Sequence, residues 1–249
     1  MFEGKIKVVD REIPRTLLGT SPFVAAAQFG HRARLYQLDL YNNPENILKI
    51  IKKSYEIGIR GIQVIPFPPV VKAVEEAIDN GFKMDVVGTV RPDKETEDIE
   101  ILSELEASSM LLHAETTDKK DWDFVGGKLQ EVKDVNAIPG LVTHMPFKTT
   151  SSLMESPIID LFNLYMVPVN KLGYLMDCDT YGKEERIQLH EMIVNLDKTI
   201  IGKKILAAGI LQPEEAFNYL KSVDFIDIVA LGIASENEAY ETFNLLNSK

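Results

Sequence analysis

Ile62-Gln63-Val64-Ile65 and Asp227-Ile228-Val229-Ala230-Leu231 are short apolar runs that carry almost no charge. Runs of this kind are typical of parallel strands covered by helices on both faces. Similar runs recur along the chain and alternate with longer amphipathic stretches, which is the pattern of repeated βαβ units. The sequence therefore predicts an α/β protein built around a parallel sheet.

The number of strand runs indicates a closed barrel. About eight strand–helix pairs fill the 249 residues, which is the number and the length typical of a (β/α)8 TIM barrel. Because no linker, repeat or low-complexity tract interrupts them, we expect a single TIM-barrel domain over residues 1–249. Residues before Thr16 are expected to form a hairpin across the barrel floor. The predicted strands are Thr16–Thr20, Gly61–Ile65, Met84–Val90, Ser109–His113, Pro139–Thr143, Leu161–Val167, Thr199–Leu206 and Asp227–Leu231.

Helix signals lie between these runs. Asn43-Pro44-Glu45 offers an N-cap and a proline in the first turn, and Gly58 suits the left-handed end of the same helix. An open doubly wound sheet is the competing architecture, and the lack of a glycine-rich fingerprint after the first strand disfavours it. The further predicted helices are Pro69–Asp79, Thr96–Leu105, Lys119–Val132, Lys183–Leu196, Pro213–Lys221 and Glu236–Leu246, with a less clear one within Phe147–Glu155.

The charge and composition of the chain disfavour some classes of binding partner. With 38 acidic and 27 basic residues the net charge is −11, which argues against nucleic acid or an anionic membrane as the partner. The single cysteine, Cys178, excludes an intramolecular disulfide framework. No apolar run reaches the roughly 20 residues of a membrane span, and the first residues lack the apolar core of a signal peptide. We expect a cytoplasmic protein, and leave its oligomeric state open.

Two histidines end adjacent predicted strands, His113 and His144. In a TIM barrel the carboxyl ends of the strands carry the site. One interpretation is a divalent metal held by both imidazoles with Glu115 or Asp118. A second, which we favour, is a site without metal in which His113 acts as a general acid. A third is that the rings only hydrogen-bond neighbouring loops.

Basic residues gather near the same rim. His31, Arg32 and Arg34 follow the first predicted strand, and Arg91 follows the third. On a protein with an acidic balance, cations at the rim would favour a small anionic ligand, which charge-assisted hydrogen bonds would hold. Ordinary ion pairing with nearby acids is the alternative. We expect the first three to bind substrate together with Gln63, and Arg91 to take part in catalysis.

Small residues follow the last two predicted strands. Gly209 and Gly232, with Ala234 and Ser235, would let a phosphate approach backbone amides at a helix N-terminus. Glycines in such turns are also common for steric reasons alone. We expect these residues, with Asn170 after the sixth strand, to bind a phosphate-bearing cofactor.

Lys203 and Lys204 end the seventh predicted strand. Strand alternation turns one of them toward the barrel interior, where burial would lower its pKa and favour a Schiff base with a carbonyl substrate. The alternative is a lysine that extends to water. Lys204 is placed with His113, His144 and Arg91 in the predicted catalytic set.

Five segments carry a resemblance to a known family: Ile13–Thr20, Ile57–Gln63, Leu111–His113, Ile200–Ile210 and Asp227–Ser235. They are similar to segments of the aldo-keto reductases, a TIM-barrel family. The resemblance implies a reductase that binds NADP at the last two strand ends, with His113 as a catalytic residue. This chain departs from the family at three catalytic positions. Gln63 stands where the family has its catalytic aspartate, Pro68 falls near the catalytic tyrosine, and Val90 or Arg91 falls near the catalytic lysine.

The leading hypothesis is an enzyme of small-molecule metabolism. It would act on an anionic substrate, or hold a phosphate-bearing cofactor, between the glycine turns and the His113 and His144 rim. The alternatives are an NADP-dependent reductase with an altered proton donor, a metal- or Schiff-base-dependent lyase, and a ligand-binding barrel without catalysis. A metal is the less favoured cofactor. All of them require the histidines and the glycine turns to open onto one mouth.

Overall fold

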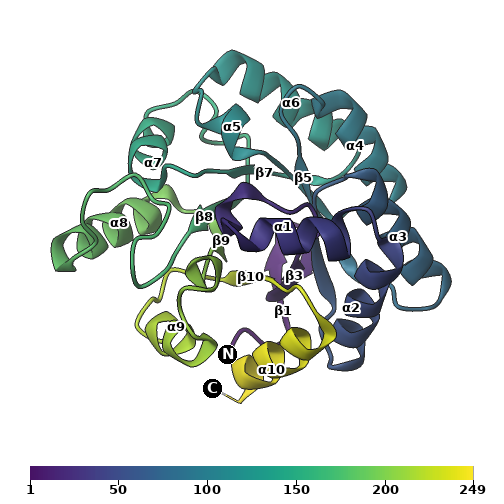
Figure 1. Ribbon diagram of the computed structural model, residues 1–249. Helices are drawn as coiled ribbons and strands as arrows, with labels where there is room; N and C mark the ends of the chain where they lie inside the picture. Colours follow the sequence, from purple (N-terminus) through teal and green to yellow (C-terminus); the bar gives the residue numbers. More distant parts are fainter. Residues whose placement is uncertain (249) are drawn as a thin grey trace.

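The barrel closes because its last strand pairs with its first. The computed structural model describes residues 1–248, and eight parallel strands form one ring in the order β10-β3-β4-β5-β6-β7-β8-β9 (Figure 1). The predicted (β/α)8 fold is therefore confirmed. The strands are β3 (Thr16–Gly19), β4 (Gly61–Val64), β5 (Asp85–Val90), β6 (Ser109–Leu112), β7 (Ile138–Val142), β8 (Leu164–Pro168), β9 (Thr199–Lys203) and β10 (Ile228–Gly232).

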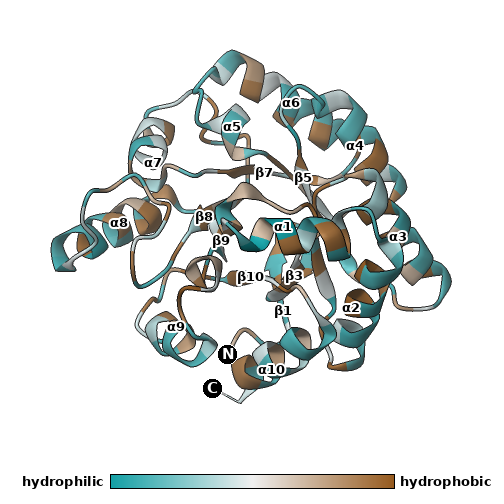
Figure 2. Ribbon diagram, in the orientation of Figure 1, coloured by the Kyte–Doolittle hydropathy of each residue, from teal (hydrophilic) through white to brown (hydrophobic). Residues whose placement is uncertain are grey.

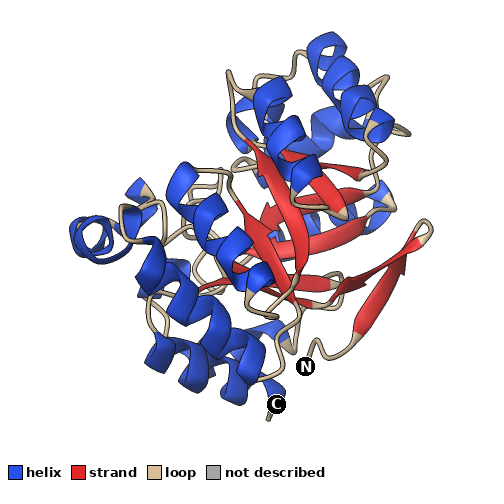
Figure 3. Cartoon of the chain, turned by 90° about the vertical axis from the view of Figure 1, so that its right-hand side faces the viewer, coloured by secondary structure: helices blue, strands red, loops and turns tan. Residues whose placement is uncertain are grey.

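The N-terminal hairpin covers the barrel floor, as predicted. β1 (Lys5–Val8) and β2 (Arg11–Pro14) pair antiparallel and lie at one end of the barrel (Figure 3). Val8 and Ile13 are buried in the cluster enclosed by the strands, together with Ile228 at the start of β10. The opposite end, where the strands finish, is thereby left for a site.

Strand side chains alternate between two hydrophobic clusters. Ile201 and Ile228 lie inside the barrel, whereas their neighbours Ile200 and Val229 pack outward beneath the helices. Hydrophobic colour accordingly concentrates on the strands, while the outer faces of the helices are hydrophilic (Figure 2). The inward position nearest the end of each strand therefore faces the barrel mouth.

Local sequence signals set the helix ends. Asn43 Oδ1 accepts a hydrogen bond from the Asn46 backbone N–H (3.3 Å), and α2 ends before Gly58, whose φ is +103°. Among residues 1–248, no helix is long and apolar enough to cross a membrane. The helices are α1 (Arg32–Tyr36), α2 (Pro44–Glu56), α3 (Pro68–Asp79), α4 (Glu95–Glu104), α5 (Ala114–Thr117), α6 (Trp122–Asp134), α7 (Pro146–Met154), α8 (Lys183–Leu196), α9 (Pro213–Leu220) and α10 (Glu236–Asn247).

Residues 21–43, which we call the cover segment, cross the barrel mouth. Figure 1 shows α1 in front of the barrel centre, and a π-helical turn, Gln37–Tyr41, continues it. The sequence did not predict this arrangement, because α1 has five residues, none of them buried, and no side-chain cap. π-helical turns are frequent at functional sites.

Candidate functional site

One cavity opens at the carboxyl ends of the strands, beneath the cover segment. Its volume is about 130 Å³, close to the roughly 150 Å³ that holds one benzene molecule, so it suits a small ligand. Its lining includes His113, His144, Gly209 and Gly232, which therefore share one mouth as expected. It is lined by Gly19, Ser21, Pro22, Gln28, Phe29, Arg32, Tyr36, Gln63, Ile65, Thr89, His113, Val142, His144, Met166, Lys203, Lys204, Ile205, Leu206, Ala208, Gly209, Ala230, Leu231, Gly232 and Glu238.

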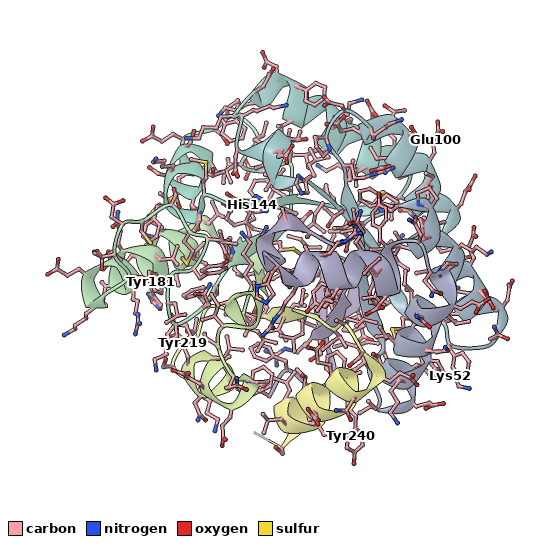
Figure 4. The ribbon with its side chains drawn as sticks, in the orientation of Figure 1. Lys52, Glu100, His144, Tyr181, Tyr219 and Tyr240 are labelled. Carbon is pink, nitrogen blue, oxygen red and sulfur yellow. The ribbon has the colours of Figure 1, made fainter. Side chains whose placement is uncertain are left out.

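The two imidazoles meet at this mouth. Their centroids are 5.6 Å apart with the rings edge to face, and Figure 4 shows His144 within the ring of helices. His113 Nδ1 accepts the Glu115 backbone N–H (3.2 Å), so the neutral ring carries its proton on Nε2. Burial, with a contribution from Lys203, lowers the pKa of both histidines, that of His144 to about 2. Each ring is therefore neutral at pH 7, with one N–H donor and one acceptor nitrogen.

Asp118 supports the end of β7 and is not free for a metal. Its carboxylate accepts hydrogen bonds from the Thr143 and Thr149 hydroxyls and from the His144 backbone N–H. Glu115 is exposed. No group of three or more His, Cys, Asp or Glu side chains within residues 1–248 has an arrangement that could hold a metal ion. The geometry thus offers no support for the predicted metal set.

The two lysines at the end of β9 both line the cavity. Lys203 follows Ile201 by two residues and shares its inward direction, while Lys204 has a φ of +58° and ends the strand. Burial is the main cause that lowers both pKa values, to about 8 for Lys204 and well below the usual value for Lys203. Lys204 Nζ reaches the Leu175 carbonyl at 3.4 Å. Strand alternation therefore assigns the inner position to Lys203 and not to the predicted catalytic Lys204.

Gln63 occupies the inner end of β4 and pairs with the next strand. Its Nε2 donates to Thr89 Oγ1 (2.8 Å), and both residues are buried. No residue that the structure describes donates to Gln63 Oε1, so this oxygen can accept a hydrogen bond from a ligand. A role in substrate binding, predicted from the sequence, is compatible with this position.

Arg32, in the cover segment, contacts the glycine turn that follows β9. Its guanidinium lies against Gly209, whose φ is +83°, in the turn that follows β9. Tyr36, one helical turn further, has a raised pKa because of burial first and then the nearby Glu238 carboxylate. The cover segment and the strand ends thus enclose the cavity together.

In the turn after β10, the backbone amides that were predicted to bind a phosphate have partners within the chain. Gly232 lines the cavity and packs against Pro22. The Ala234 N–H donates to the Glu238 carboxylate (2.6 Å), and Ser235 Oγ accepts the Glu238 N–H (3.1 Å). The chain's own carboxylate therefore fills the position at the N-terminus of α10 where a phosphate was expected.

Arg91, predicted as catalytic, lies outside the cavity lining. Its guanidinium forms a bidentate ion pair with Asp98, whose side chain is fully buried, and it stacks 4.8 Å from the centroid of the Phe67 ring. The backbone N–H of Arg91 also donates to the same carboxylate. We assign this arginine a structural role.

Three further predicted residues also lie outside the lining. Asn170 is buried, and its amide hydrogen-bonds the backbone of Leu172 and Tyr174, so it stabilises its own loop. His31 is exposed, and Arg34 donates to Gln37 (2.9 Å) on the outer face of the cover segment. Of the predicted basic cluster, only Arg32 reaches the cavity.

Thr89, Met166, Tyr36 and Glu238 are among the lining residues that the sequence interpretation missed. Thr89 and Met166 could have been found by counting inward positions on their strands, as Lys203 was. Tyr36 and Glu238 carried no such signal, because the first lies on a short helix without a pattern and the second was interpreted only as part of a helix start.

Comparison with known proteins supports the fold but does not define the reaction. No protein-family model matches the chain, and no curated protein matches it in sequence. A structure named as an aldo-keto reductase from Pseudomonas aeruginosa is 15% identical, with a TM-score of 0.66 over 99% of this chain and 95% of that one. Gox0644, solved in complex with NADPH, is 10% identical, with a TM-score of 0.65 over 98% and 88%. Phospho-2-dehydro-3-deoxyheptonate aldolase from Thermotoga maritima is 10% identical, with a TM-score of 0.57 over 99% and 74%.

Proposed function

We propose that the protein is an enzyme of small-molecule metabolism that binds a small anionic substrate in the mouth cavity. The observation that carries the proposal is the charge of the lining. Arg32 and Lys204 contribute two cationic groups, against the single carboxylate of Glu238. This local balance is opposite in sign to the net charge of −11 of the whole chain. A concave site with such a lining attracts and holds an anion.

The lining offers two kinds of polar group, cations that can hold an anion and neutral imidazoles. Arg32 supplies a guanidinium, and Lys204 is largely protonated at pH 7 because its pKa is about 8, so both can hold an anionic group. His113 and His144 are neutral at this pH, and each can donate one hydrogen bond and accept one at a reacting centre. The volume of about 130 Å³ favours a substrate with few heavy atoms.

The structural neighbours agree with this class without defining the reaction. They include reductases and an aldolase whose name contains a phosphorylated oxo acid. At 10–15% identity the likeness concerns the fold, and function must be argued from the site.

The test is isothermal titration with inorganic phosphate and with pyruvate, and glycerol as the neutral control. We expect saturable binding of at least one anion and none of glycerol. Arg32→Gln should weaken the anion at least tenfold, or about 1.4 kcal/mol. Arg34→Gln is the matched control, because Arg34 lies two residues away on the outer face of the same segment. Equal losses in both variants, or no anion binding at all, would refute the proposal.

A reductase is the second candidate, favoured by the likeness to a structure solved with NADPH. The residues present do not fit a dinucleotide in this conformation. Arg32 lies on the Gly209 turn, Glu238 occupies the Ala234 amide, and the Asn170 amide is engaged in its own loop. We therefore derive no step through NADPH. Saturable quenching of NADPH fluorescence by the protein would revive this candidate, and no quenching at millimolar NADPH would remove it.

A further inference from the structure

We infer that Lys203 forms an imine with the substrate, which makes that substrate a small anionic aldehyde or ketone. The inference rests on the proposed function, since the same cavity must admit the anion. The amine lies at the inner end of β9 and lines the cavity. Among residues 1–248 it has no hydrogen-bond or ion-pair partner, which is unusual for a lysine in a buried position.

The groups around the amine explain why it stays unpaired. Asp118 is the acid that favours its charge, but that carboxylate already accepts three hydrogen bonds from the β7 end. Lys204 repels a second positive charge, and the two facing histidines are neutral. Burial is the largest influence on Lys203, and by lowering its pKa it favours the neutral amine, the form with a free lone pair.

The chemical step balances without any further reactant. The Lys203 Nζ lone pair attacks the carbonyl carbon, a C–N bond forms, and the carbonyl π pair moves to oxygen, which takes a proton. The amine gives up its protons as the carbinolamine loses that oxygen as water, which leaves the C=N bond. Amine and carbonyl thus yield imine and one water, with no oxidation or reduction. Both amine protons pass to that oxygen and leave with it in the water, so neither histidine changes its protonation state. The His113 Nε2–H donates a hydrogen bond to the oxygen while negative charge develops on it.

The anionic group of the substrate would lie against Arg32 and Lys204, which line the same cavity with charged donors. Two points of attachment, one covalent and one ionic, fix the orientation of a small molecule. A 2-oxo acid is the simplest compound that carries both groups.

The experiment is reductive trapping at pH 7. The protein is incubated with pyruvate and sodium cyanoborohydride, which reduces an imine to a stable secondary amine, and the modified lysine is located by peptide mass mapping. A parallel sample receives formaldehyde, which needs no anion site. We expect Lys203 to be modified in both samples at least tenfold faster than the exposed Lys183, because burial favours the neutral amine at Lys203. Lys203→Met should lose this modification, and Lys204→Arg should keep it.

The outcomes separate this inference from the proposed function. Lys203 modified no faster than Lys183 by either carbonyl would overturn the imine. Pyruvate binding in the titration without modification would also overturn it, while the anion site would stand. Selective modification of Lys203 by formaldehyde, without binding of any anion in the titration, would support the reactivity of the Lys203 amine and refute the proposed function.

Discussion

The Arg32 guanidinium lies against Gly209, so close that a Cβ at residue 209 would overlap its Nη1 atom. This contact joins the cover segment to the turn after β9, at the edge of the cavity. It holds α1, none of whose residues is buried, in addition to the buried Phe23 and Leu40 that anchor the rest of the segment. The contact also places the Arg32 guanidinium, the cation of the proposed anion site, directly against the backbone of Gly209.

Gly209→Ala is therefore expected to weaken anion binding. The new methyl group displaces Arg32, and the φ of +83° adds a backbone strain of about 1–2 kcal/mol. Gly81→Ala is the matched control, because Gly81 has the same φ and no atom within 4 Å of its Cβ position. Urea unfolding should show similar losses of stability for the two variants, and titration with phosphate should show weaker binding only for Gly209→Ala. Equal anion affinity in both variants would contradict the contact.

Arg91→Met should destabilise the fold without changing the anion site. It leaves the fully buried Asp98 carboxylate without its ion pair, which costs about 3–5 kcal/mol. Chemical denaturation would measure this loss. Arg91→Lys keeps the charge but loses the bidentate geometry, and we expect an intermediate loss. An Arg91→Met protein with unchanged stability and impaired ligand turnover would return Arg91 to the catalytic set.

His144 should make the protein sensitive to acid. Its pKa is about 2 in the folded state and near 6.5 in the unfolded state, so the unfolded chain binds more protons between these values. Stability contributed by the neutral ring is complete above pH 6.5 and falls as the pH decreases. Between pH 7 and pH 5 the loss is at most about 2 kcal/mol. His144→Gln should show a smaller loss over this interval in urea titrations, with His190→Gln on α8 as control. Identical pH dependence in wild type and His144→Gln would contradict the burial of the ring.

Lys203→Met should stabilise the protein at pH 7. An amine kept in a desolvated position opposes folding, and a methionine of similar length removes that cost. The lowered pKa also means that wild-type stability rises with pH until the unfolded lysine deprotonates near pH 10.4, since the unfolded chain binds more protons. The variant should show a shallower rise above pH 7 in thermal unfolding. Destabilisation by Lys203→Met would instead indicate that the amine has a structural partner.

Most of the fold could be predicted from the sequence because it depends on local patterns. β4 and β10 are apolar runs, and α2 has its cap and its terminal glycine in the sequence itself. β9 ends earlier than predicted, because Lys204 adopts a left-handed backbone conformation. The residue types around Lys204 do not predict a left-handed backbone conformation at this position.

The site could be predicted only where strand ends define it. His113 and His144 follow directly from the end positions of β6 and β7, which all strands of a barrel present at one mouth. Arg91 and Asn170 were expected there but lie outside the cavity lining. Their partners Asp98 and Tyr174 are close in sequence, but the pairing is visible only in three dimensions. Arg32 was distinguishable from Arg34 only once α1 was placed across the mouth.

The most direct test of the account is a crystal structure of the protein grown with pyruvate and treated with cyanoborohydride. We predict density continuous with Lys203 Nζ, with the pyruvate carboxylate between Arg32 and Lys204. A cavity without ligand, or pyruvate bound elsewhere with an unmodified Lys203, would contradict it.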